Sequence, residues 1–147
     1  MLRILITLLA ISLASGCASL PELKDEVIQA RKSGREGEMR VYPVSVDQAW
    51  DITEAVFRWE KTDELEEHRQ ENYVITSSGM KSAAFGTVMG VWIEPVDMKS
   101  SRITVIARQR GDCCVLTNLT PPNFFKRFEQ GVAIVKSGRR LPLYFYK

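Results

Sequence analysis

Histidine and cysteine are scarce in this chain of 147 residues, which has one histidine, His68, and three cysteines. Protein zinc sites use three or four cysteine, histidine or carboxylate ligands at characteristic spacings, and no such pattern is present here. The chain also lacks a Gly-x-Ser-x-Gly nucleophile elbow and the Gly-Lys-Ser/Thr ending of a phosphate-binding loop. We therefore expect no enzyme activity, no catalytic residue, no metal site and no cofactor.

The apolar stretch at the start of the chain is too short to cross a bilayer. A membrane-spanning helix needs about 20 apolar residues, and residues 4–13 provide half that length. Arg3 precedes this stretch and the small residues 14–16 follow it, an order typical of a secretory signal peptide. Cys17 comes next, and Ser-Gly-Cys resembles the lipobox of bacterial lipoproteins, although Ala14 stands where leucine is commonest.

The lipobox implies an organisation and a location. We expect residues 1–16 to be a lipoprotein signal peptide, residues 17–38 the lipidated cysteine with a tether, and residues 39–147 a single domain. Acyl chains on Cys17 would anchor the protein to the membrane, because each buried methylene contributes about 0.8 kcal/mol. No aspartate follows Cys17, which favours the outer membrane. The expected location is the bacterial cell envelope, lipid-anchored at the outer membrane and facing the periplasm.

The tether is expected to contain a short charged helix that starts near Pro21, since proline suits the first helical turn. Its apolar stripe is thin, and it ends in a flexible linker at residues 33–37. A spacer between lipid and domain is the main interpretation, and a partner-binding helix is the alternative.

Two cysteines remain after the lipidated one, Cys113 and Cys114, and they are adjacent. A disulfide between sequence neighbours closes a strained ring, because bridged Cα atoms normally lie about 4.4–6.8 Å apart. We expect two small buried hydrophobes, and a vicinal disulfide or an intermolecular link stays open.

Hydrophobic periodicity predicts an α+β fold. Strands are expected at residues 39–44, 64–69, 73–76, 85–93 and 102–110, and amphipathic helices at 46–61 and 121–137. Ser45 and Gln48 have capping-box spacing at the start of the first of these helices. Short turns between strands favour an antiparallel sheet of about four to six strands, with the two helices on one face, a two-layer sandwich. Trp50 is expected in the core and Trp59 at its rim, with a ligand-stacking pair as the alternative.

Charge is distributed unevenly along the chain. Residues 22–97 carry 16 acidic and 9 basic side chains, whereas residues 98–147 carry 2 acidic and 10 basic ones. The candidate partner contacts lie in the second segment: Arg102, Arg108 and Arg110 on one face of a strand, and Tyr144 and Tyr146 in the aromatic, basic tail. A solvated face, or pairing of the arginines with Glu64, Glu66 and Glu67, is the simpler interpretation. Aromatic residues are not interleaved with the arginines, so no nucleic-acid partner is expected.

Three short motifs resemble a family of small uncharacterised bacterial lipoproteins. They are Val-Ser-Val-Asp-Gln-Ala-Trp at residues 44–50, Ser-Ser-Arg-Ile-Thr-Val at 100–105 and Gly-Asp at 111–112. A more distant likeness is to the helix-grip domains of BamC, a lipoprotein of the outer-membrane assembly machine. The resemblance implies no catalytic residues.

The function expected from these features is that of an envelope lipoprotein without a known specific role, a non-catalytic binding or scaffold module. Its partners would be the membrane, through the anchor at Cys17, and an envelope protein. The alternative is a carrier that holds a small apolar ligand or lipid between helix and sheet.

Overall fold

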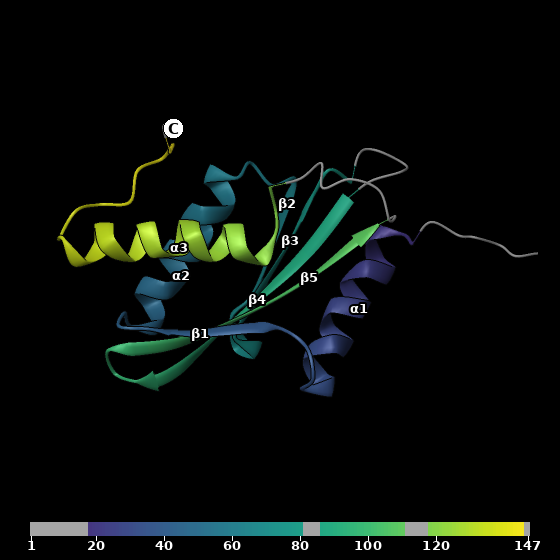
Figure 1. The fold of residues 1–147 in the computed structure, drawn as a ribbon, viewed down its shortest axis with the longest axis horizontal. Helices are drawn as coiled ribbons and strands as arrows, with labels where there is room; N and C mark the ends of the chain where they lie inside the picture. Colours follow the sequence, from purple (N-terminus) through teal and green to yellow (C-terminus); the bar gives the residue numbers. More distant parts are fainter. Residues whose placement is uncertain (1–17, 81–85, 111–117, 146–147) are drawn as a thin grey trace, which may run out of the picture.

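A sheet of five antiparallel strands is at the centre of the fold (Figure 1). The computed structural model describes residues 18–80, 86–110 and 118–145. The elements in chain order are α1 (Leu20–Ser33), β1 (Glu38–Tyr42), α2 (Val46–Trp59), β2 (Glu64–His68), the 3-10 turn η1 (Arg69–Glu71), β3 (Tyr73–Ser78), β4 (Gly86–Asp97), β5 (Ser100–Arg110) and α3 (Pro121–Lys136). The strand order is β1-β5-β4-β3-β2, so β1 and β2 are the edges of the sheet.

The two predicted amphipathic helices begin at the predicted residues, Val46 and Pro121. The Ser45 side chain accepts from the Gln48 backbone N–H at 3.3 Å, and the Gln48 side chain accepts from the Ser45 N–H at 3.0 Å. Thr120 caps α3, where Pro121 and Pro122 occupy the first turn and have no N–H that would need a partner. Both helix starts are therefore set by local sequence.

Helices α2 and α3 cover one face of the sheet, as expected from the sequence. Phe57 from α2 and Phe124, Phe125 and Phe128 from α3 are at most 1 % exposed, and they fill the layer between helices and sheet. The predicted α+β sandwich is confirmed. Burial of these rings is the main contribution to the stability of this layer, since a fully buried phenylalanine contributes about 1.5–3 kcal/mol.

Helix α1 lies on the opposite face of the sheet, and the prediction that this segment is a spacer is wrong (Figure 1). Leu23, Val27 and Ala30 are buried against β3, β4 and β5. Ion pairs reinforce the contact: Arg31 Nη2 lies 2.8 Å from Glu94 Oε1, and Lys24 pairs with Glu64 and Glu66 on the edge strand β2. The sheet thus has helices on both faces, and α1 is part of the folded domain.

Gly90 on β4 has no side chain, and this lets α1 pack closely against the sheet. A Cβ atom at this position would lie 2.8 Å from Val27 Cγ1 and 2.7 Å from Trp92 Cη2. We expect Gly90→Val to lower the free energy of unfolding by about 1–3 kcal/mol, because overpacking forces neighbouring side chains out of their rotamers. Urea denaturation measures this, and adding Val27→Ala should restore part of the loss. Unchanged stability in Gly90→Val would show that α1 is not held here.

Candidate functional site

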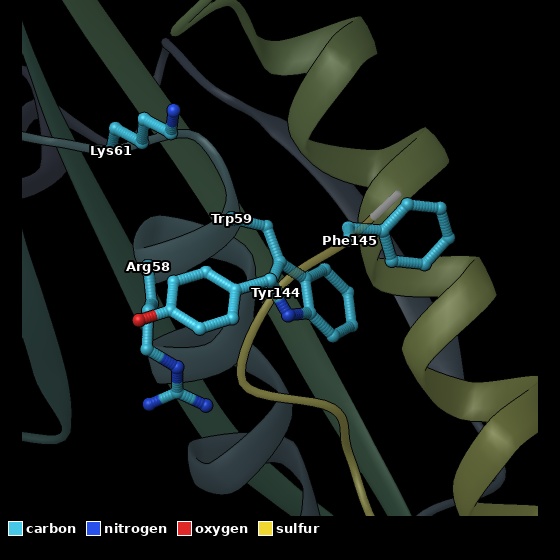
Figure 2. A pocket seen from close by; sticks show the side chains of 5 residues that line it. All are labelled: Arg58, Trp59, Lys61, Tyr144 and Phe145. Carbon is cyan, nitrogen blue, oxygen red and sulfur yellow. The ribbon is translucent and has the colours of Figure 1, made fainter. Parts of the chain in front are cut away.

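A pocket of about 430 Å³ lies where the C-terminal tail, residues 139–145, crosses the end of α2. Its lining is Arg58, Trp59, Lys61, Tyr144 and Phe145 (Figure 2). Two segments that are far apart in the sequence thus form one site, which we call the tail pocket.

Aromatic contacts fix the tail in place. The Trp59 indole N–H donates to the Pro142 carbonyl at 2.9 Å, and the Trp59 and Phe145 ring centroids are 4.9 Å apart. The Arg127 guanidinium, from α3, lies 4.6 Å from the Phe145 centroid. Arg127 is itself held by Glu60, with 2.8 Å between Nε and Oε1. The floor of the pocket is therefore aromatic and well anchored.

The open side of the pocket is basic. Arg58 and Lys61 are exposed, and neither forms an ion pair with any of the residues that the structure describes. Lys61 follows the end of α2 with a φ of 53°, in the left-handed region where glycine or asparagine is usual. Tyr144 is 66 % exposed. Two cations beside an exposed aromatic ring suit an anionic group that carries an apolar part.

One acidic side chain near the tail pocket, Glu54, is paired with Arg69. An adjoining pocket of about 350 Å³ shares Arg58 and includes Asp51, Glu54, Arg139 and Arg140. Burial raises the pKa of Glu54, its carboxylate lies 2.8 Å from Arg69, and the Arg69 guanidinium also covers the ring of the buried Trp50. The tail-pocket lining contains no acid, although the charge of Arg58 also acts on Glu54 in the adjoining pocket.

The predicted arginine face does not form one open surface. Arg108 pairs with Glu36, and Arg110 Nε donates to the Ala18 carbonyl at 2.6 Å, so the segment around α1 occupies both. Arg102 is exposed. The acids expected to pair with these arginines contact other cations, Lys24 for Glu64 and Glu66 and Arg69 for Glu67.

Of the predicted tail contacts, Tyr144 lies in the tail pocket. Tyr146 is outside the described residues, as are Cys17 and the Cys113–Cys114 pair. Trp59 is 9 % exposed and Trp50 3 %, so Trp50 is in the core and Trp59 at its rim, as predicted. The tail itself packs against α2 and α3 and adds no strand to the sheet.

His68 packs as a structural side chain. Its ring stacks on Tyr73 at 4.3 Å between centroids, and its nitrogens lie 3.6 Å from Glu66 and 3.4 Å from Glu71. Across residues 18–80, 86–110 and 118–145, no group of three or more histidine, cysteine or acidic side chains could hold a metal ion. None of the helices in this part of the chain is both long and apolar enough to cross a bilayer.

Comparisons with known proteins give no family. No protein-family model matches the sequence, and no curated protein matches it significantly. Two solved structures align with a TM-score of 0.34. One is a conserved protein from Geobacillus kaustophilus, with 11 % identity over 65 % of this chain and 92 % of that one. The other is the di-domain aromatase/cyclase StfQ of the steffimycin biosynthetic pathway, with 8 % identity over 67 % of this chain and 42 % of that one. Both scores are too low to support an argument.

Proposed function

We propose that this protein is a bacterial envelope lipoprotein, anchored by acyl chains on Cys17 at the outer membrane and facing the periplasm. The observation behind the anchor is the order of residues 1–17: a basic start, a short apolar run, small residues and a cysteine. The folded domain would be a non-catalytic binding module. What supports this role is the tail pocket, where Arg58 and Lys61 are exposed beside an aromatic floor.

An anionic group is the ligand that fits the tail pocket. Arginine and lysine donate charge-assisted hydrogen bonds to carboxylate or phosphate oxygens, and the exposed Tyr144 ring offers an apolar contact beside them. The alternative is a carrier with its ligand between helix and sheet, and on the α2 and α3 face it is disfavoured because phenylalanine side chains fill the layer beneath these helices.

The anchor is tested by intact-mass measurement and membrane fractionation of the protein made in its bacterial host. We expect a mature form that begins at Cys17 and carries acyl chains, and we expect Cys17→Ser to leave the membrane fraction completely. Two acyl chains already anchor a protein stably, so the loss should be all-or-none. Cys113→Ser is the matched control, because it removes a thiol but keeps the lipobox. A mature wild-type form without acyl chains would contradict the proposal.

A further inference from the structure

The start of the described chain and the tail pocket lie at the same end of the sheet. Arg110, the last residue of β5, pairs with Gly86 and holds the Ala18 carbonyl. On β3, Ser77 pairs with Val88, and the Ser77 carbonyl accepts from the Asp63 N–H at 2.8 Å. We call this end of the sheet the anchor end.

At the anchor end, β3 and β5 lie close together in the sheet. Val88 pairs both with Ser77 and with Arg108, so β3 and β5 are separated only by β4. At a strand spacing of about 4.8 Å, this corresponds to about 10 Å across the sheet. Lys61 precedes Asp63 by two residues and therefore belongs to this end, on the α2 side, while α1 begins on the other side.

No long spacer separates the proposed lipid from the anchor end. Ala18, the residue after Cys17, is already held by Arg110, and α1 begins two residues later with a capping box at Ser19. If Cys17 carries acyl chains, the anchor end must lie at the level of the lipid headgroups. This step rests on the proposed function.

The α2 side of the anchor end has the side chains of an interfacial surface. Arg58 and Lys61 are exposed, and the neighbouring Leu143 and Tyr144 are 67 % and 66 % exposed. Lysine and arginine are attracted to anionic lipid surfaces, and tyrosine is enriched at headgroup depth. The two acids close to Lys61 in sequence have partners: Glu60 pairs with Arg127, and Asp63 accepts a hydrogen bond from the Met80 N–H at 3.3 Å.

We propose that the anchor end lies against the bilayer and that the tail pocket binds the phosphate of an anionic phospholipid headgroup. Arg58 and Lys61 would bind the phosphate oxygens, and Leu143 and Tyr144 would contact the apolar boundary below. A lipid is favoured over an acidic protein because the pocket is at the end of the domain where the anchor begins, and because exposed apolar side chains adjoin its cations.

The test is lysine footprinting of the purified full-length lipoprotein in vesicles. One set of vesicles is made of phosphatidylcholine, and the other contains one third phosphatidylglycerol. An amine-acylating reagent reports the accessibility of each lysine by mass spectrometry. Lys99, in the turn between β4 and β5 at the opposite end of the sheet, is the internal control.

We expect acylation of Lys61 to be about fivefold slower in phosphatidylglycerol vesicles than in phosphatidylcholine vesicles. This factor corresponds to the attraction of about 1 kcal/mol between one basic residue and an anionic lipid surface. The rate at Lys99 should stay the same. Arg58→Gln should weaken the dependence on phosphatidylglycerol, and the control Arg35→Gln, in the turn after α1, should not.

Three results would overturn the proposal. Equal rates at Lys61 in both vesicles would exclude the headgroup site, and protection of Lys99 in place of Lys61 would reverse the orientation. If Lys61 were protected in native membranes but not after purification into vesicles, the ligand of the pocket would be an acidic protein. Failure of the proposed anchor is seen separately, because a chain without acyl groups is recognised by intact mass before any vesicle is made.

Discussion

Phe125→Ala is expected to lower the free energy of unfolding by about 3–5 kcal/mol, as truncation of a buried phenylalanine usually does. The Phe125 side chain is fully buried, with its centroid 5.6 Å from that of Phe124 and 6.4 Å from that of Tyr42. The Arg40 guanidinium covers the same ring at 4.4 Å. Alanine would leave a cavity between α3 and the sheet, and a domain has only about 5–15 kcal/mol of total stability.

Urea denaturation at a fixed temperature measures this loss. Leu143→Ala is the matched control, because that side chain is 67 % exposed and its truncation should change stability by no more than about 0.5 kcal/mol. A loss below about 1 kcal/mol for Phe125→Ala would mean that α3 is not packed on the sheet as described.

Arg127→Leu is expected to cost about 3 kcal/mol, because it leaves a buried carboxylate without its cation. The Glu60 side chain is 6 % exposed and the Arg127 side chain 16 %, and their Oε1 and Nε atoms are 2.8 Å apart. The substitution also removes the guanidinium from the face of Phe145, 4.6 Å away. The tail should therefore loosen together with the loss of stability.

The double variant Glu60→Leu/Arg127→Leu separates the cost of an unpaired Glu60 carboxylate from the cost of removing the guanidinium from Phe145. Replacing both members of a buried ion pair by apolar residues is often neutral, so we expect it to recover most of the stability measured by urea denaturation. Arg139→Leu, at an exposed position, is the matched single control. If Arg127→Leu and Arg139→Leu unfold at the same urea concentration, the Glu60 pair does not support the tail.

The helices on the phenylalanine side could be predicted because their signals are local. Ser45 and Gln48 mark the start of α2, and the apolar residues recur at helical spacing after them. The apolar run of β4 is nearly continuous, as expected for a strand in the middle of a sheet, and β4 is the middle strand.

The docking of α1 could not be predicted, because its partners are distant in the sequence. Only three of its residues, Leu23, Val27 and Ala30, are buried, and charged residues surround them. The pattern resembles that of a solvated helix, but Lys24 and Arg31 pair with acids on β2 and β4. Periodicity shows that a helix forms, and it does not show which surface the helix covers.

The tail pocket could not be predicted either, because its two sides are also distant in the sequence. The rim position of Trp59 follows from its place on the α2 helix, but the pocket exists only because the chain returns to it 83 residues later, at Pro142. Sequence alone therefore does not indicate that Arg58 and Lys61 line one pocket. Tyr144 can be predicted as a contact residue from the aromatic, basic composition of the tail, since tyrosine is common at contact surfaces.

The position of α1 also sets the order in which the domain can be completed. The ribosome makes α1 before any strand, but the face it covers is built from β3, β4 and β5. The bond between Ala18 and Arg110 spans 92 residues of chain. Contacts of such long range form slowly, because a large loop must close before they contribute. The nascent chain therefore exposes the apolar stripe of α1 until β3, β4 and β5 have been synthesised.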